Sequence, residues 1–419
     1  MYQIRRCFKR WGWLIAASLC LTIACTPTPT PDSGGPESVG DSNRVAIGTT
    51  LKVRTLDPAD TYEIAGLNIL YNVSETLYTY ELGTAELVPL LAAEMPTVSD
   101  DALTYTIPLK EGITFQDGSP FNAEAMKFSL DRFIENGGKP SFLLADLVAE
   151  TAAIADYTLE VTLNQPFAAF PSLLAFPGTA AVPPSAYEIG AGAFNTDGLV
   201  GTGPYQLASF SEEAIKLDPN PNYWGEAPLN EGIDIQVYSG NSANLFNGFR
   251  TGAVDIATQS LDPEQIKTLL AGAEDGDWQA LAAPGTTIYY LTLNRNQEPL
   301  DQLEIRQAIA SLIDRALIVE RVLQGQGDPL YSLVPSAFSA YEPAFEQYGD
   351  GDFAQAKALL SEAGFSAESP AEIEIWHSTG SPVRGIVAQT LAALAEQELD
   401  GMLVFIPESV DFATATQNL

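Results

Sequence analysis

The sequence predicts a mixed fold of the α/β or α+β class, in which strands and helices follow one another along most of the chain. Two patterns favour this class. Apolar and polar residues alternate in short segments, and apolar residues recur at helical spacing in longer ones. The chain has 419 residues, of which 46% are hydrophobic, so it is long enough for two or three domains with sizeable cores.

The expected elements can be placed in order along the chain. Alternation predicts strands at residues 44–53, 103–109, 113–115, 159–163, 233–238, 253–257, 287–293, 373–376 and 402–406. Helical spacing predicts helices at residues 64–78, 122–134, 243–251, 303–323, 353–363 and 387–396. Asn122 is expected to cap the second helix, Gly137 and Gly138 to end it, and Asp314 to restart the long one. The proline- and glycine-rich stretch 177–228 is expected to hold loops and short strands.

The chain is strongly acidic, with 54 Asp and Glu residues against 20 Lys and Arg residues and a net charge of −34. A nucleic-acid-binding protein needs a basic face for the phosphates, so that class of function is excluded. There is one His, and the three Cys residues (Cys7, Cys20 and Cys25) all lie in the first 25 positions. A metal site built from several histidines is therefore excluded as well.

The first 24 residues are typical of a signal peptide. A basic segment at residues 1–10 precedes an apolar segment at 11–24, which is shorter than the ~20 residues needed to span a bilayer. Cys25 follows directly, so the segment resembles a bacterial lipoprotein signal in which Cys25 becomes the lipidated first residue, although Thr22 stands where leucine is usual. Ordinary cleavage and a short uncleaved anchor are the alternatives. Residues 25–44, rich in Thr, Pro and Gly, should form an extended tether, and cleavage before Cys25 leaves a net charge of −38.

The residues capable of catalysis give no enzyme signature. His377 is followed by Ser378 and Thr379, but sequence neighbours rarely have the geometry of a catalytic triad, and no G-x-S-x-G motif occurs. Carboxylate pairs are too frequent in so acidic a chain to indicate a glycosidase. The sequence predicts no catalytic residue, no metal site and no cofactor, and favours a binding protein over an enzyme. Three aromatic clusters either pack in a core or stack on a ligand: Tyr289-Tyr290, Phe167 with Phe170, and Tyr223-Trp224.

Residues 91–132 closely resemble the signature of one family. The segment includes the run Lys110-Glu-Gly-Ile-Thr-Phe-Gln-Asp-Gly118 and ends at Arg132. The family is that of the extracellular solute-binding proteins (family 5) of ABC importers, which bind oligopeptides, dipeptides, nickel chelates and related solutes. Its other landmarks occur in the family's order: Leu56-Asp-Pro58, Glu75-Thr-Leu-Tyr78, Gly201-Thr-Gly-Pro-Tyr205, Asn220-Pro-Asn-Tyr-Trp-Gly225, Asn294, Ile305-Arg-Gln-Ala-Ile309 with Ile313-Asp-Arg315, and Ala356-Lys-Ala-Leu-Leu360 with Glu362-Ala-Gly-Phe365.

The resemblance implies a fold like that of the type II periplasmic binding proteins, with two lobes that close on a solute around a hinge. Lobe I would comprise residues 45–75 and 185–285, with an inserted subdomain at 76–184, and lobe II would comprise residues 286–419. The chain would act as a monomer. It would capture a peptide-like solute outside the cytoplasmic membrane, in the periplasmic space or at the cell surface, and deliver it to the permease and ATPase subunits of an ABC importer.

Local roles follow for several landmark residues. Asp117-Gly118 should make a tight turn before the helix at 122–134. Gly201 and Gly203 should let the backbone bend sharply, and Arg306 and Arg315 should tie helices to acidic loops.

The resemblance also suggests four ligand contacts, at Thr61, Tyr62, Phe142 and Tyr289, although each would equally serve packing. A peptide would be held mainly through its backbone. Three alternatives remain open: the same fold binding a nickel chelate or another small solute, a secreted hydrolase that uses carboxylates, and a truncated product without transport function.

The end of the sequence departs from the family pattern. Family members usually continue well beyond the strand that matches residues 402–406, where they complete the second lobe, whereas this sequence stops at Leu419. A fragment or a truncated product is therefore expected, with the C-terminal part of lobe II missing.

Overall fold

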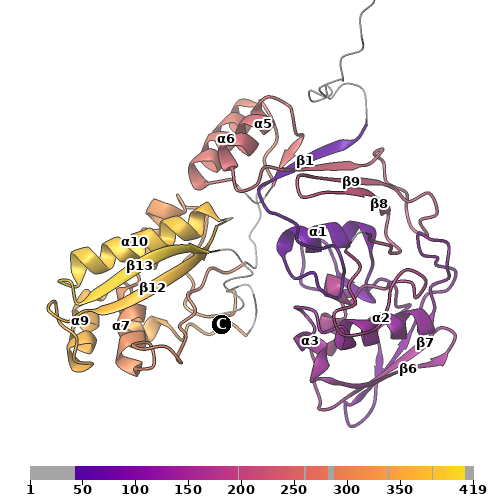
Figure 1. Cartoon of the computed structure of the whole chain (residues 1–419), viewed down its shortest axis with the longest axis horizontal. Coiled ribbons are helices and arrows are strands. Elements are labelled where there is room, and N and C mark those ends of the chain that lie inside the picture. The colour runs from indigo at the N-terminus through magenta and orange to yellow at the C-terminus, as the bar shows by residue number, and fades with distance from the viewer. Residues whose placement is uncertain are drawn as a thin grey trace, which may run out of the picture. The chain divides into compact units, whose positions relative to one another are not determined.

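The computed structural model describes residues 43–196, 198–258, 261–281, 287–336, 338, 340–379 and 381–410. These residues form a mixed α and β structure, which confirms the predicted class (Figure 1). The predicted signal peptide, Cys25 and all but the last two residues of the predicted tether lie outside the described residues, as does the segment 411–419. No helix within the described ranges is long and apolar enough to cross a membrane.

A five-stranded mixed sheet combines the first strand with strands that follow residue 204. Its order is β11-β1-β10-β9-β8, with β1 parallel to both β10 and β11 and the other pairs antiparallel. Leu70 of α1 is buried against this sheet together with Ile215 and Leu217 of β9, while Leu245 of α5 is buried beside β1. The elements are β1 (Val45–Thr49), α1 (Ile64–Val73), β8 (Tyr205–Phe210), β9 (Ala214–Pro219), β10 (Ile233–Val237), α5 (Ser242–Arg250), β11 (Ile256–Ala257) and α6 (Pro263–Asp275).

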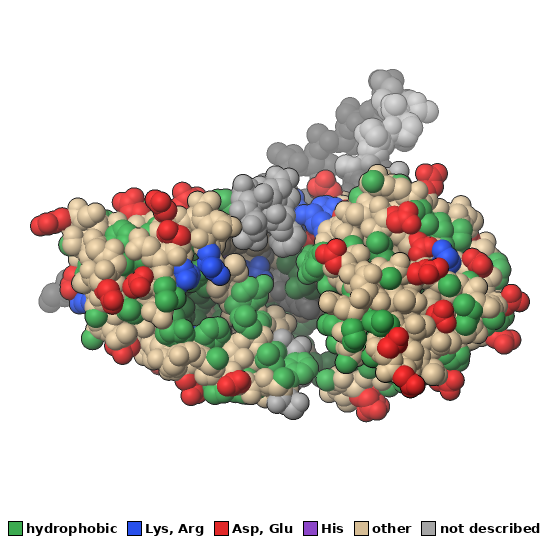
Figure 2. All heavy atoms as spheres, turned by 90° about the horizontal axis from the view of Figure 1, so that it is seen from below, with side chains coloured by type: hydrophobic (Ala, Val, Ile, Leu, Met, Phe, Trp, Pro, Cys, Tyr) green, Lys and Arg blue, Asp and Glu red, His purple; other side chains and the backbone are tan. Residues whose placement is uncertain are grey.

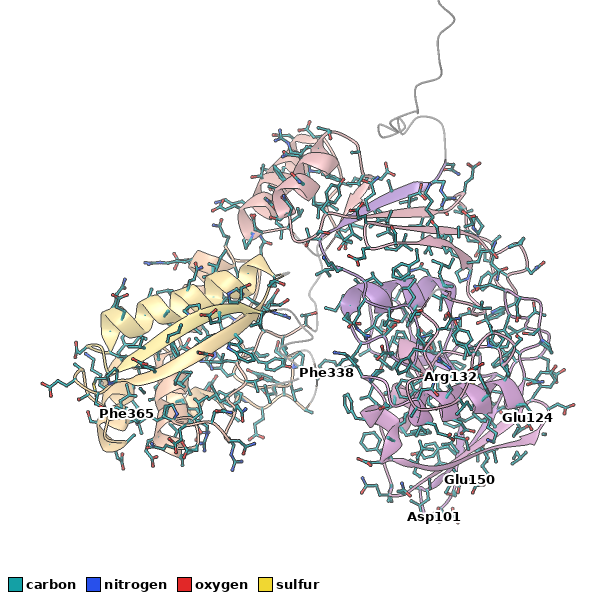
Figure 3. All side chains as sticks on the ribbon, in the orientation of Figure 1. Asp101, Glu124, Arg132, Glu150, Phe338 and Phe365 are labelled. Atoms are coloured by element: carbon teal, nitrogen blue, oxygen red, sulfur yellow. The ribbon has the colours of Figure 1, made fainter. Side chains whose placement is uncertain are left out.

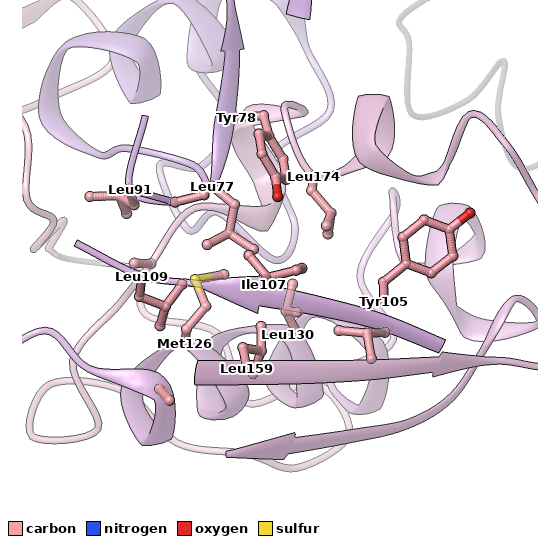
Figure 4. Close-up of a cluster of buried hydrophobic side chains, with 14 of the residues drawn as sticks. Leu77, Tyr78, Leu91, Tyr105, Ile107, Leu109, Met126, Leu130, Leu159 and Leu174 are labelled. Carbon is pink, nitrogen blue, oxygen red and sulfur yellow. The ribbon is translucent and has the colours of Figure 1, made fainter. Parts of the chain in front are cut away.

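The segment between α1 and β8 builds a second core around a four-stranded antiparallel sheet of order β4-β5-β7-β6. Met126 and Leu130 of α2 pack against Ile107 of β5 and Leu159 of β7, and all four are at most 1% exposed (Figure 4). The elements are β2 (Tyr78–Tyr80), β3 (Leu87–Pro89), β4 (Thr97–Val98), β5 (Thr104–Pro108), α2 (Ala123–Glu135), α3 (Phe142–Ala145), β6 (Val148–Ala155), β7 (Thr158–Leu163), α4 (Phe170–Leu173) and the 3-10 helix η1 (Pro177–Thr179).

Residues 303–410 form a third core, in which helices cover a parallel pair of strands. β12 and β13 run in register from Ala371 opposite Leu403 to Ser378 opposite Val410. Alternate residues of both strands are buried in a cluster that includes Leu360 of α9. The elements are α7 (Leu303–Leu312), α8 (Arg315–Leu317), the π-helical turn η2 (Ile318–Val322), the 3-10 helix η3 (Glu346–Tyr348), α9 (Phe353–Glu362), β12 (Ala371–Ser378), α10 (Pro382–Glu398) and β13 (Leu403–Val410).

Most predicted elements are confirmed, and so are two of the predicted caps. The side chain of Asn122 accepts a hydrogen bond from the amide of Ala125 at 3.0 Å and begins α2. The long helix is broken at Ile313, and Asp314 caps the next turn by accepting from the amide of Leu317 at 2.8 Å. Capping side chains are therefore readable from the sequence, because they act within a few residues of themselves.

Several other predictions are wrong. The first helix ends at Val73 rather than continuing to Tyr78, because the next residues bond to segments far away in the sequence. Residues 113–115 and 287–293 are not strands, although Thr114 and Pro120 form an isolated bridge. Strand β6 and helix α6 were not predicted, since their exposed faces blur the apolar periodicity.

Candidate ligand-binding surface

Asp57 and Arg132, from two of the landmarks, form a buried ion pair with two parallel hydrogen bonds. The Nη1 and Nη2 atoms of Arg132 donate to the two carboxylate oxygens of Asp57 at 2.8 and 2.5 Å. The side chains are 1% and 0% exposed, and Arg132 lies inside the structure in Figure 3. Arg132 also donates to the carbonyls of Glu188 and Ala193, both at 3.0 Å. A buried pair of this kind needs such additional bonds to offset its desolvation.

The loop that follows β1 is fixed by Asp57 and Thr61. The carboxylate of Asp57 accepts from the amides of Ala59 at 2.9 Å and Asn195 at 2.6 Å. The hydroxyl of Thr61 donates to the carbonyl of Asp57 at 2.7 Å and is fully buried. The side chain of Thr61 therefore stabilises the loop, and its predicted contact with a ligand stays a prediction.

Glu75 brings three more landmark side chains together. The residue is only 5% exposed. Its carboxylate accepts hydrogen bonds from the hydroxyl of Thr202 at 2.7 Å, the hydroxyl of Tyr223 at 2.9 Å and the indole N–H of Trp224 at 2.7 Å. Lys110 lies over the ring of Trp224, 4.7 Å from its centroid. Landmarks that are far apart in the sequence thus converge on one carboxylate.

Burial raises the pKa of Glu75 above its usual value. The hydrogen bonds from Trp224, Thr202 and Tyr223, together with the positive charge of Lys110, oppose this effect without cancelling it. All three donors are neutral, so the carboxylate is stabilised by dipoles rather than by a direct ion pair.

Gln116 joins the two points at which the chain leaves and re-enters the five-stranded sheet region. Its amide nitrogen donates to the carbonyls of Val73 and Tyr205, and its amide oxygen accepts from the amide of Gly201, all at 2.8 Å. A Cβ on Gly201 would lie 2.4 Å from the carbonyl oxygen of Val73, and one on Gly203 would lie 2.7 Å from the carbonyl carbon of Val73. Neither glycine has a left-handed φ. The backbone bends at residues 202–204, as predicted, and these glycines also allow close backbone approach.

Three other local predictions can be checked. Gly118 has a φ of +83°, and Asp117 accepts from the amide of Ser119 at 2.9 Å, so the predicted tight turn is confirmed. Arg315 pairs with Asp350 at 2.7 Å, which confirms its contact with an acidic loop. Arg306 donates to the backbone carbonyls of residues 300, 301 and 302, so it ties its helix to the preceding loop through carbonyls rather than through a carboxylate.

Two of the predicted ligand contacts, Tyr62 and Phe142, meet at the surface. Their rings lie edge to face, with centroids 5.9 Å apart and an interplanar angle of 88°. The side chains are 38% and 58% exposed, and the ring of Phe176 lies 6.2 Å from that of Tyr62. Tyr289 is 57% exposed but belongs to another segment of the chain. Cys25, the predicted lipidation site, lies outside the described residues.

The remaining aromatic and catalytic candidates have other surroundings. Phe170 packs in a core against Tyr105, with ring centroids 4.9 Å apart, while Tyr223 and Trp224 bond to Glu75. His377 lies in β12, and its Nδ1, the atom that bonds the orienting carboxylate in a triad, has no hydrogen-bond partner. Within the ranges that the structure describes, no group of three or more His, Cys, Asp or Glu side chains is arranged to hold a metal ion.

Carboxylates are spread over the face shown in Figure 2, with few basic side chains between them. This distribution follows from the composition of the chain and singles out no acidic site. The aromatic pair therefore offers a more specific surface than charge does.

Sequence reasoning missed Phe176 and Gln116. Phe176 stands before a proline–glycine turn with no pattern to mark it. Gln116 is part of the family signature, but nothing local indicates that its amide bonds to segments more than forty residues away.

The family comparison accounts for the landmarks. Residues 86–399 match the model for bacterial extracellular solute-binding proteins, family 5 (middle part). The chain belongs to this family. It is the solute-binding component of an ABC importer, an exported protein that works with permease and ATPase subunits.

Similar proteins support the same assignment. The glutathione-binding protein GsiB of Salmonella typhi is 30% identical over 392 residues, which cover 91% of this chain and 72% of GsiB. The structure of Haemophilus influenzae OppA in complex with RPPGFSPFR has a TM-score of 0.76 at 22% identity and covers 90% of this chain and 78% of OppA. The murein tripeptide binding protein MppA of Escherichia coli has a TM-score of 0.77 at 22% identity, covering 90% of this chain and 77% of MppA. The two structures show the shared fold, which confirms the prediction of a type II periplasmic binding protein.

Proposed function

We propose that this family 5 solute-binding protein captures a short peptide or peptide-like solute. Three of its relatives are named for such ligands or are seen with one: glutathione, a murein tripeptide and the peptide RPPGFSPFR. A peptide is recognised through its backbone and through surfaces that accept varied side chains. The chain offers a surface that can accept varied side chains.

The observation that carries this proposal is the exposed aromatic pair of Tyr62 and Phe142. Large aromatic side chains that stay accessible on a rigid base give contact area at little cost in conformational entropy. The loop that carries Tyr62 is fixed by the buried Asp57–Arg132 pair, so the base is rigid. Apolar side chains and peptide planes of a solute would pack on these two rings.

The predicted organisation into lobes forms part of the same proposal. Lobe I would comprise residues 45–75 and 185–285, the inserted subdomain residues 76–184, and lobe II residues 286–419. The separate buried clusters around Leu70, Met126 and Leu360 support these divisions. Tyr289 would contact the solute from lobe II, and closure would be driven by tighter binding to the closed form.

We further propose that Cys25 carries the lipid that tethers the protein to the membrane. Its position directly after an apolar segment, and ahead of a Thr- and Pro-rich stretch, supports this. Mass spectrometry of the mature N-terminus tests it: a diacylglyceryl-modified Cys25 is expected, and an unmodified N-terminus at any other residue would refute it.

A thermal-shift screen of the 419-residue chain tests the ligand class. Pools of peptides, sugars, polyamines and nickel chelates would be compared at equal concentration. Because a ligand that binds only the folded protein stabilises it by about 2.7 kcal/mol at a hundred times its Kd, a peptide pool should raise Tm by a few degrees. Stabilisation by nickel chelates alone, or by no peptide pool, would reject the peptide proposal.

A further inference from the structure

We propose that the loop at residues 57–60 is clamped onto the end of α2, and that this clamp sets the spacing of Tyr62 and Phe142. Arg132 and Gly138 are then positioning residues for ligand binding. The inference rests on the proposed function, because it takes the aromatic pair as the surface that the solute contacts.

The two rings come from separate parts of the chain. Tyr62 lies near the end of the loop that follows β1, whereas Phe142 begins α3, beyond the end of α2. The two residues are far apart in the sequence, so the 5.9 Å separation of their rings depends on how the loop packs against the end of α2.

Three contacts seat the loop. The first is the ion pair between Asp57 of the loop and Arg132, which lies in the last turn of α2. The second is the close passage of the loop over Gly138, where a Cβ would lie 2.0 Å from the carbonyl oxygen of Ala59. The third is a hydrogen bond from the amide of Lys139 to the carboxylate of Asp60 at 3.2 Å.

The close contact at Gly138 is directly connected to Phe142. The amide of Ser141 donates to the carbonyl of Gly138 at 3.0 Å, so Phe142 follows Gly138 within one tight turn. On the loop side, Arg54 bonds the carboxylates of Asp60 at 2.5 Å and Glu63 at 2.7 Å, one on each side of Tyr62 in the sequence. A shift of the loop away from Gly138 therefore changes the distance between the rings.

Gly138 does not have a left-handed φ, so the requirement for glycine here is one of space. Gly138→Ala must push the loop off the end of α2, because the obstructing atom is backbone. Binding surfaces lose affinity when their groups shift by about 0.5 Å or more. Gly138→Ala should therefore weaken ligand binding about tenfold while leaving the core of residues 303–410 intact.

The test is a double-mutant cycle on Kd, measured by calorimetry on the full chain with glutathione and with the peptide RPPGFSPFR as probes. The variants are Gly138→Ala, Phe142→Ala and both together. Gly327→Ala is the matched control, since a Cβ there meets only a flexible Leu323 side-chain carbon at 3.1 Å. Gly138→Ala should raise Kd about tenfold, and the control should raise it less than twofold. In a chain that already carries Phe142→Ala, adding Gly138→Ala should raise Kd less than twofold.

Arg132→Lys is the second variant, because it keeps the positive charge but loses the bidentate hydrogen bonding to Asp57. It should weaken binding severalfold at temperatures where circular dichroism shows a native spectrum, and this loss should also vanish in the Phe142→Ala background. A role in stability alone would leave the loss unchanged in that background.

The possible failures are distinguishable. If Phe142→Ala weakens binding but the losses from Gly138→Ala and Arg132→Lys are absent, or are the same in both backgrounds, the positioning inference is overturned and the proposed function stands. If Tyr62→Ala and Phe142→Ala both bind as the unaltered chain does, or if no peptide, those of the screening pools included, saturates the chain, the proposed function is overturned and the inference with it.

Discussion

The region at residues 43–220 and the region at 303–410 are stabilised in different ways. In the first, buried polar groups link distant segments: Asp57 with Arg132, and Glu75 with its three donors. In the second, the described core is apolar, and its ion pairs lie nearer the surface. Among the described residues, every buried polar side chain except that of Ser311 lies between Thr49 and Asn220.

This difference explains why the family landmarks have different characters. In the first region they are polar and glycine residues whose partners are far away in sequence, so each is hard to replace alone. In the second, several are helix residues such as Ile309 and Leu360 that fill volume, while the polar landmarks Asp314 and Arg315 bond to partners nearer in sequence. Removing one partner of a buried polar contact leaves the other unsatisfied, whereas a core side chain loses only its own burial and packing.

The largest effect is expected from Arg132→Met. It leaves the carboxylate of Asp57 buried without its cation, which should lower the free energy of unfolding by about 3–5 kcal/mol. Urea unfolding followed by circular dichroism measures this. Arg315→Met is the matched control, because Arg315 and Asp350 are 16% and 21% exposed and water can replace the lost contact. Equal losses in the two variants would contradict the distinction between the regions.

A somewhat smaller loss is expected in the apolar region. Leu360→Ala removes a fully buried side chain and should cost about 3 kcal/mol in unfolding free energy, from lost burial and the cavity that remains. Leu360→Met conserves volume and should cost under about 1.5 kcal/mol. A large loss in Leu360→Met would show that shape, rather than volume, matters at this site.

The sequence predicts what acts locally and misses what acts at a distance. The alternation of residues 103–109 and the Asn122 cap depend on neighbours, and both are confirmed. The end of α1 at Val73 was missed, because it depends on contacts to Gly203 and to Gln116. The site shows the same division. Tyr62 and Phe142 were predicted one by one, but only the structure shows that they touch.

Glu75 should give a moderate effect that depends on pH. Glu75→Leu leaves the hydroxyls of Thr202 and Tyr223 and the indole of Trp224 without their acceptor, at a cost of about 2 kcal/mol near neutral pH. Glu75→Gln retains an acceptor oxygen and should cost less. Urea unfolding of the three proteins measures both values.

The sign of the pH effect follows from the raised pKa of Glu75. Because the folded protein binds this proton more tightly than the unfolded chain does, the contribution of Glu75 is fully present below the unfolded value of about 4.3. It is lost as pH rises through the raised value. The stability of the unaltered chain relative to Glu75→Gln should therefore increase as pH is lowered towards that range. A decrease would contradict the raised pKa.

The smallest effect is expected at the surface of the second region. Lys357 and Asp400 form an ion pair at 2.7 Å, but the side chains are 37% and 72% exposed. Lys357→Met should change the unfolding free energy by under about 1 kcal/mol, and the change should shrink further in 0.5 M salt. A loss of unfolding free energy as large as that of Arg132→Met would contradict the expected difference between surface and buried ion pairs.

Calorimetric titration of the Tyr62→Ala/Phe142→Ala double variant with the best-binding peptide tests most directly whether this aromatic pair binds the solute. Tyr80→Ala removes a similarly exposed ring elsewhere, at 41% exposure, and serves as the control. Loss of both rings should weaken binding about thirtyfold, whereas Tyr80→Ala should bind within twofold of the unaltered chain. Equal affinity in the double variant and the unaltered chain would contradict the assignment of this surface.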